Sequence, residues 1–182
     1  MIPVLDHGFV DIVSATPSTV QLYSLVTNFN RGAWHPKFLK IPTMVLRIKC
    51  PLFVQLWLSE SQISLITAKT DDEPVAYVPT VAEIGCPDLK TSEIIQNNIS
   101  QTAEALMLNP KAYQTDSCDR FISQVNSPVS VYNTLVAYGN LETWLEVTNQ
   151  RGLPKPIEAY RKAIHDCAAT EWTDIRQWSA KK

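Results

Sequence analysis

The clearest pattern of apolar and polar positions lies in the middle of the chain. Across Thr43–Lys49, apolar residues occupy every second position, which is the two-residue period of a half-buried β-strand. Pro51 ends this strand and opens an apolar run that continues to Leu58. Proline is tolerated in the first turn of a helix, where its missing N–H leaves no partner unpaired. The pattern therefore predicts a strand that leads directly into a buried helix.

The rest of the chain mixes expected strands and helices, without repeats or a glycine-serine linker. Helical spacing of apolar residues is clearest near the C-terminus, where it predicts one helix over Ile157–Trp178. The other expected elements are a strand over Val4–Val13, helices over Pro17–Asn30, Glu93–Asn109, Asp116–Val125 and Pro128–Asn149, and loops over Thr67–Leu89 with at most a short strand at Val75–Val78.

Length and composition favour one domain spanning residues 1–182, because 182 residues with 45% hydrophobic content suffice for a real core. The net charge is −2 and the basic residues are scattered, so the chain lacks the positive stripe that nucleic-acid binding requires. Neither a signal segment nor a membrane-spanning apolar run is recognisable, which favours a cytoplasmic protein without a membrane partner.

The cysteines favour reduced, mostly buried thiols over a metal site. Cys50, Cys86, Cys118 and Cys167 are more than thirty residues apart and form no C-x-x-C pair. A structural zinc site needs closely spaced ligands, so no metal is expected. The tryptophans Trp144, Trp172 and Trp178 are interpreted as core or interface aromatics.

Several segments together resemble the flavin-dependent thymidylate synthases (ThyX). The strand, proline and apolar helix of Thr43–Leu58 follow the order found in that family, and Val4–Val13 resembles its opening strand. Pro128–Thr134 is similar to the family's Leu-Pro-x-x-x-Tyr-Thr motif, which is interpreted as a helix start. Asn140 and Arg151 have the spacing of the family's Asn and Leu-Arg positions.

This resemblance implies an α+β fold, in which several helices pack on a small, mainly antiparallel sheet. ThyX proteins bind flavin adenine dinucleotide (FAD) between the subunits of a homotetramer, so a homo-oligomer, FAD and a pyrimidine nucleotide are the implied partners. Arg151 takes the place of a substrate-binding arginine, although it also suits a solvated helix end. Asn140 takes the place of a flavin-contacting asparagine, although it also suits a bond to neighbouring backbone.

The chain departs from ThyX where that family carries its reactive groups. Ser59–Ser64 stands in place of the Arg-His-Arg-x-x-Ser signature, and Leu39–Ile41 stands in place of a Phe-Glu-His element. Gln124 and Glu142 replace further ligand contacts, and Lys155 with Pro156 stands near the family's His-Ala-Gln element. No catalytic residue is assigned, because a serine nucleophile needs a neighbouring base.

Three functions remain open from the sequence. The first is a ThyX-like protein of thymidylate metabolism that has an altered nucleotide pocket and lacks ordinary thymidylate synthase activity. The second is an active enzyme that uses flavin and folate to transfer a methyl or hydroxymethyl group to C5 of a pyrimidine nucleotide. The third is a structural or partner-binding protein.

Overall fold

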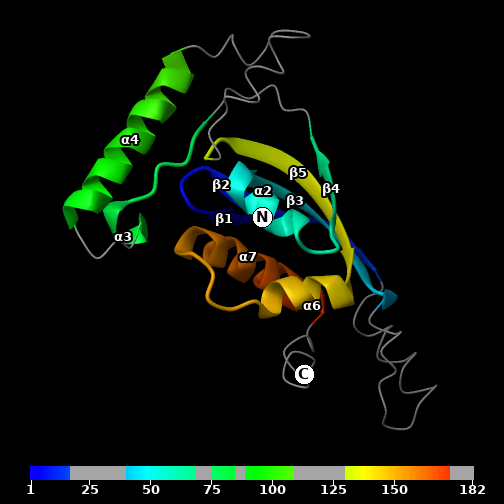
Figure 1. Cartoon of the computed structure of the whole chain (residues 1–182). Helices are drawn as coiled ribbons and strands as arrows, with labels where there is room; N and C mark the ends of the chain where they lie inside the picture. The colour runs from blue at the N-terminus through cyan, green and yellow to red at the C-terminus, as the bar shows by residue number, and fades with distance from the viewer. Residues whose placement is uncertain (17–39, 69–74, 85–88, 109–129, 173–182) are drawn as a thin grey trace, which may run out of the picture.

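A five-stranded antiparallel sheet in the order β1-β2-β3-β5-β4 forms the centre of the fold (Figure 1). The computed structural model describes residues 1–16, 40–68, 75–84, 89–108 and 130–172. The strands are β1 (Ile2–Val4), β2 (Gly8–Thr16), β3 (Thr43–Pro51), β4 (Ser64–Thr67) and β5 (Tyr132–Asn140). The helices are α2 (Leu52–Ser59), α3 (Val81–Ile84), α4 (Leu89–Leu108), α6 (Leu141–Asn149) and α7 (Lys155–Glu171).

The predicted strand and helix in the middle of the chain are confirmed. β3 runs to Pro51, and α2 starts at the next residue with Pro51 as its N-cap. Met44, Leu46 and Ile48 are fully buried, as the alternation predicts. α2 turns the apolar side chains Val54, Trp57 and Leu58 into the core, which places its C-terminal end beside the later helices.

The N-terminal segment forms a hairpin, so the expected strand over Val4–Val13 is confirmed for Gly8–Val13, whereas Val4 ends a separate strand. β1 and β2 pair antiparallel, and Leu5 in the turn between them has a φ of 56°. The Asp6 carboxylate accepts a hydrogen bond from the backbone N–H of His7 at 2.9 Å. Asp and Gly are typical turn residues, and their presence between short apolar runs explains the reversal.

The expected helix over Pro128–Asn149 is also wrong, because its central part is strand β5. β5 pairs with β3 on one side and with β4 on the other, and the helix α6 begins only at Leu141. Thr134 and Leu135 are both buried although they point to opposite faces of the sheet. A strand in the middle of a sheet loses its clean alternation in this way, so helical spacing fitted it equally well.

The remaining predictions have mixed outcomes. α4 is confirmed but begins at Leu89 instead of near Glu93. α7 begins earlier than expected, at Lys155, and ends at Glu171 with Trp172 as its C-cap. Segment 75–78 contributes only a single bridge, between Ala76 and Val131. The helices expected over residues 17–30 and 116–125, and the end of the last helix over residues 173–178, lie outside the described residues.

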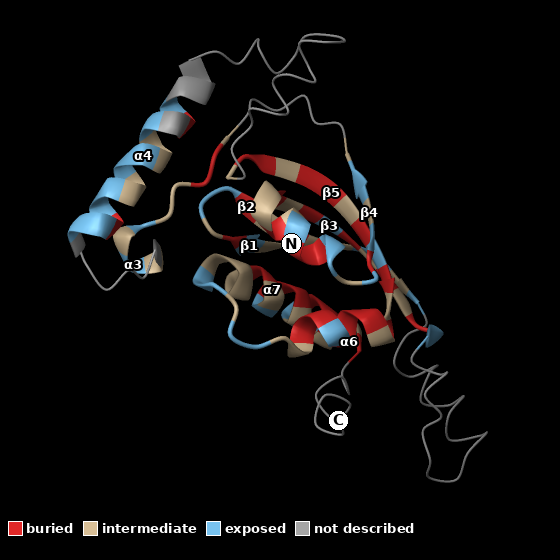
Figure 2. Cartoon of the chain, viewed as in Figure 1, coloured by how far each residue is buried: buried red, intermediate tan, exposed pale blue. Residues whose placement is uncertain are grey.

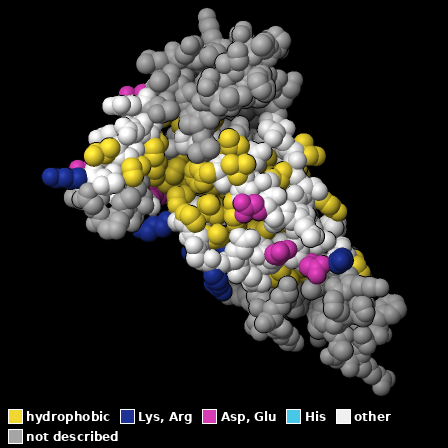
Figure 3. All heavy atoms as spheres, in the orientation of Figure 1, with side chains coloured by type: hydrophobic (Ala, Val, Ile, Leu, Met, Phe, Trp, Pro, Cys, Tyr) yellow, Lys and Arg dark blue, Asp and Glu magenta, His cyan; other side chains and the backbone are white. Residues whose placement is uncertain are grey.

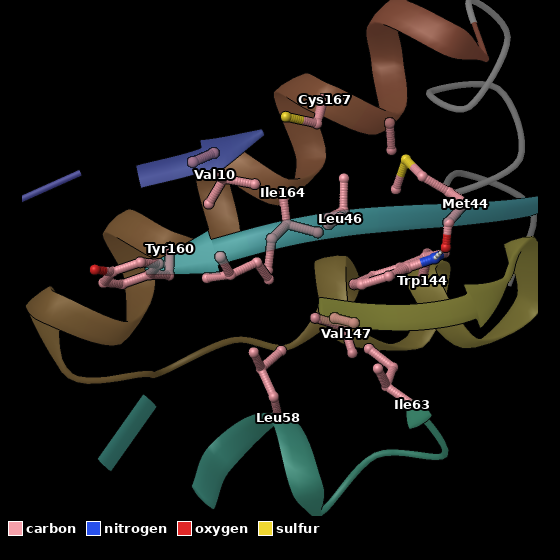
Figure 4. Packing of buried hydrophobic residues seen from close by; sticks show 14 of the residues in the cluster. Val10, Met44, Leu46, Leu58, Ile63, Trp144, Val147, Tyr160, Ile164 and Cys167 are labelled. Carbon is pink, nitrogen blue, oxygen red and sulfur yellow. Dashed lines mark hydrogen bonds between the residues drawn. The ribbon is translucent and has the colours of Figure 1, made fainter. Parts of the chain in front are cut away.

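The core lies between the sheet and the helices α2, α6 and α7. Figure 2 shows the buried positions on these helices and on the central strands, and Figure 4 shows how their side chains interlock. Trp144 and Trp172 are fully buried, which confirms their interpretation as core aromatics, whereas Trp178 lies outside the described residues. The Trp144 indole N–H donates to the carbonyls of Met44 at 3.2 Å and Gly139 at 3.1 Å, so it ties α6 to β3 and β5.

Two cysteines are buried free thiols in this core, as the sequence predicts. Burial raises the pKa of Cys50 to about 12 and that of Cys167 to about 11, so both remain protonated at neutral pH. Cys86 and Cys118 lie outside the described residues. Among the helices that the structure describes, none is long and apolar enough to cross a membrane.

Candidate functional site

The break between α6 and α7 carries Arg151, and local chemistry fixes its shape. α6 ends at Asn149, Gln150 is its C-cap, and α7 starts after Pro154. Gly152 has a φ of 72°, a left-handed conformation that glycine adopts without steric cost. A Cβ atom at Gly152 would have no neighbour within 4 Å, so the space around this turn is open in the described structure.

Two side chains from other elements hold this break in place. The Trp57 indole N–H on α2 donates to the Gln150 side-chain oxygen at 2.6 Å. Arg161 on α7 donates through one terminal nitrogen to the carbonyl of Thr148 at 2.5 Å. Thr148 and Gln150, which precede Arg151, are therefore anchored to α7 and α2. This anchoring reduces the conformational freedom that is lost when a ligand binds there.

Among the described residues, none forms a hydrogen bond or an ion pair with the Arg151 guanidinium. The described part of the chain contains the arginines Arg47, Arg151 and Arg161. Arg47 pairs with Asp11 at 2.9 Å and Arg161 pairs with Glu158 at 2.5 Å. Arg151 is exposed and makes no hydrogen bond or ion pair with a described residue. Of these three arginines, Arg151 is therefore the one whose five N–H donors are not engaged by a described residue and can bind a ligand.

The start of α7 adds a favourable field for an anion near Arg151. A helix carries partial positive charge at its N-terminus, and α7 has no side-chain cap there. Lys155 stands in the first turn and donates to the carbonyl of Ala82 at 2.8 Å, so it also links α7 to α3. Arg151, Lys155 and the helix N-terminus place positive charge at this end of α7, and the acidic Glu158 in the same turn is paired with Arg161.

The residues in place of the ThyX signature, Ser59–Ser64, run from the end of α2 to the start of β4. The Ser59 hydroxyl donates to the carbonyl of Leu56 and the Ser61 hydroxyl to that of Leu58, each at 2.6 Å. Both serines therefore use their hydroxyls for hydrogen bonds at the end of the helix. Glu60 between them is exposed. The serines engage backbone oxygens, and none of these residues supplies a positive charge.

Asn140 lies at the opposite end of α6 from Arg151. Its side-chain oxygen accepts from the backbone N–H and the hydroxyl of Thr143, both at 3.0 Å, so Asn140 is the N-cap of α6. Arg151 follows Asn140 by eleven positions in the sequence. With a rise of about 1.5 Å per helical residue, the two lie roughly 16 Å apart. The structure does not bring them together, and a cofactor role for Asn140 stays a prediction.

Acidic side chains surround the ends of α2 and α6 where ThyX proteins have cations. Glu142 in the first turn of α6 lies 3.7 Å from Lys40, and Glu146 in the same helix is exposed. In Figure 3, acidic side chains stand beside the hydrophobic ones on the face that carries α2 and α6. Such carboxylates repel phosphate groups, so this face is less favourable for an anion than the break at Arg151.

The sequence reasoning missed the Trp57–Gln150 contact and the Glu158–Arg161 pair, which shape the surroundings of Arg151. The second had a readable signal, because residues three apart on a helix face one another. The first had none, since Trp57 and Gln150 are distant in sequence. Within the ranges that the structure describes, no group of three or more His, Cys, Asp or Glu side chains gathers to hold a metal ion.

Comparisons with known proteins identify the fold but not a family. Neither a protein-family model nor a curated protein matches the sequence. The UMP/dUMP methylase PolB from Streptomyces cacaoi, bound with 5-Br UMP, matches with a TM-score of 0.71 and 14% identity over 98% of both chains. Its complex with 5-Br dUMP matches with a TM-score of 0.69 and 15% identity over 97% of this chain and 96% of PolB. The fold is ThyX-like.

The confirmed ThyX-like fold allows the fit of FAD to be tested on the described residues. FAD carries a pyrophosphate, which proteins hold with cations or with free N–H donors. At the signature positions, Ser59 and Ser61 direct their hydroxyls to the backbone, and Glu60 carries negative charge, as does Glu142 at a further ligand position. The described residues at these positions therefore do not fit the pyrophosphate of FAD.

Proposed function

We propose that this chain is a ThyX-like protein that binds a pyrimidine nucleotide at Arg151 and lacks ordinary thymidylate synthase activity. The observation that supports it is the exposed guanidinium of Arg151, which no described residue pairs with, on an anchored break. The fold around it is shared with PolB, whose structures hold 5-Br UMP and 5-Br dUMP.

Arg151 suits a nucleotide because its donors form a planar fork. A guanidinium binds phosphate or carbonyl oxygens through paired hydrogen bonds, and this pairing sets direction as well as strength. The N-terminus of α7 adds partial positive charge, and Lys155 adds a full charge nearby. These groups favour a singly phosphorylated nucleotide, whose one phosphate needs only one compact cationic position.

Ordinary ThyX catalysis requires more positive charge than this chain provides. The family mechanism depends on a fixed cationic pocket for both nucleotide and flavin, and such preorganised charge supplies a large share of catalysis. In a homo-oligomer, a neighbouring subunit would offer Arg31, Arg120 or Arg161 to refill the site, but Arg161 is already bound to Glu158 and Thr148. Arg31 and Arg120 lie outside the described residues. The predicted homo-oligomer remains a proposal, which sedimentation equilibrium tests.

The substitution Arg151→Ala is expected to weaken binding of dUMP and UMP by about 10-fold to 100-fold. This range corresponds to the roughly 1.5–3 kcal/mol that a charged hydrogen-bonding group contributes. Isothermal titration calorimetry measures the change in Kd. Lys162→Ala is the matched control, since Lys162 is an exposed cation farther along α7, and it should retain wild-type affinity.

Two results would contradict the proposed pocket. If Arg151→Ala binds dUMP as tightly as the wild type, the nucleotide occupies another position. If the wild-type protein binds neither dUMP nor UMP, the pocket itself is refuted, and a structural or partner-binding role becomes the better hypothesis.

A further inference from the structure

The sheet has a second face, opposite the one against which α2, α6 and α7 pack. Those helices bury the face that carries Met44, Leu46 and Ile48. Side chains alternate between the two faces along a strand, so the residues between these three belong to the second face. The pairing of the neighbouring strands β3, β5 and β4 then defines an outer face, which carries Val45, Val136, Tyr138 and Ile66.

The apolar side chains of the outer face are adjacent and accessible. Tyr138 pairs with Val45, and Val136 pairs with Ile66. Ile66 is 69% exposed and Tyr138 is 49% exposed, while Val13 at the bulge of β2 is 58% exposed. Single exposed apolar side chains are ordinary on a protein surface, whereas neighbouring ones form a patch that marks an interaction site.

Two charged side chains beside this patch form a pair. Arg47 lies opposite Val136 in the sheet and donates to the Asp11 carboxylate at 2.9 Å. Its guanidinium carbon also lies 5.4 Å from the centre of the Phe9 ring. A partner that covers Arg47 and Asp11 therefore buries a matched pair and not a lone charge, whose burial would be costly.

We propose that the outer face is the contact between two copies of this chain, which pack sheet against sheet. An antiparallel sheet face with β-branched and aromatic side chains packs well on a second face of the same kind, about 10 Å away. A second copy presents that same surface, and a two-fold axis makes the contact identical for both copies. This interface rests on the residues of the sheet and is independent of nucleotide binding.

The size of the outer face suits such a dimer. β2, β3 and β5 have nine residues each. At about 3.3 Å per residue and about 4.8 Å per strand, these strands and the shorter β4 cover a flat outline of roughly 500 Å². The relief of the side chains makes the accessible area larger than this outline. It is therefore comparable with the area of about 800 Å² that each partner contributes to a standard interface.

Sedimentation equilibrium of the full chain tests this interface, at concentrations of about 1–100 μM. The wild type should associate. Ile66→Glu and Tyr138→Glu each place a carboxylate in the apolar contact, and each should weaken the association at least about 100-fold. Ile94→Glu is the matched control, because Ile94 lies on α4 with 60% of its surface exposed, and this variant should associate like the wild type.

A wild-type protein that stays monomeric at about 100 μM would overturn the proposal. It is also overturned if Ile66→Glu and Tyr138→Glu associate like the wild type, or if Ile94→Glu dissociates as strongly as they do. Circular dichroism verifies that each variant is folded. If a glutamate variant unfolds, the double variant Ile66→Thr/Tyr138→Ser removes the apolar contact without adding charge, and it should dissociate as well.

Discussion

Trp144→Ala is expected to lower the free energy of unfolding by about 3–5 kcal/mol, the usual cost of removing a large aromatic side chain from a core. Trp144 is fully buried, and its indole N–H donates to the carbonyls of Met44 and Gly139. The substitution leaves a cavity between α6 and the sheet, as its place in Figure 4 shows. Because Arg151 follows α6, nucleotide binding should weaken as well.

Urea unfolding followed by circular dichroism measures this loss of stability. Leu56→Ala is the matched control, because Leu56 lies on α2 with 52% of its surface exposed and should change stability by no more than about 0.5 kcal/mol. A loss below about 1 kcal/mol for Trp144→Ala would show that the core does not depend on this side chain.

Gly8→Ala should destabilise the fold by about 3 kcal/mol, at the upper end of the cost of overpacking. A Cβ atom at Gly8 would lie 1.9 Å from the Tyr160 hydroxyl, 2.7 Å from the carbonyl oxygen of Val4 and 2.8 Å from that of Lys49. Two of these neighbours are backbone atoms that cannot rotate away. The Tyr160 hydroxyl donates to the Lys49 carbonyl at 2.8 Å, so the clash also disturbs the contact between α7 and β3.

Gly152→Ala provides the comparison for Gly8→Ala, because the two glycines differ in what surrounds them. Gly152 has open space around it. The substitution there should therefore lower the free energy of unfolding only through the left-handed backbone, whose φ of 72° costs an alanine roughly 1–2 kcal/mol. Thermal or urea unfolding should therefore rank Gly8→Ala as the more damaging substitution. The reverse order would mean that the hairpin accommodates a methyl group by moving away from α7.

The sequence predicted elements whose patterns are set by one buried face. β3 has regular alternation, and α7 buries one helical stripe, so both were recognisable. β5 was not, because it lies between two strands and is buried on both faces near Thr134 and Leu135. Gly139 and Asn140 mark the true boundary, where the strand ends and Asn140 caps α6.

The sequence predicted where along the chain Arg151 lies, but it did not predict how the side chains around it are paired. The break at Gly152 and Pro154 was visible in the sequence, so Arg151 was correctly placed between two helices. Whether Arg151 is paired depends on side-chain positions in three dimensions. The sequence could not reveal that Glu158 is occupied by Arg161 or that Gln150 is held by Trp57.

According to the proposed function, this protein binds a pyrimidine nucleotide but lacks ordinary ThyX turnover. An anaerobic assay with dUMP, methylene-folate, flavin and reductant tests the missing turnover most directly. Calorimetric binding of dUMP to the same preparation shows that the pocket is intact. Formation of no thymidylate above the enzyme-free control, in a preparation that binds dUMP, is the expected result. Turnover at a rate typical of enzymes, roughly 1 per second or faster, would contradict it.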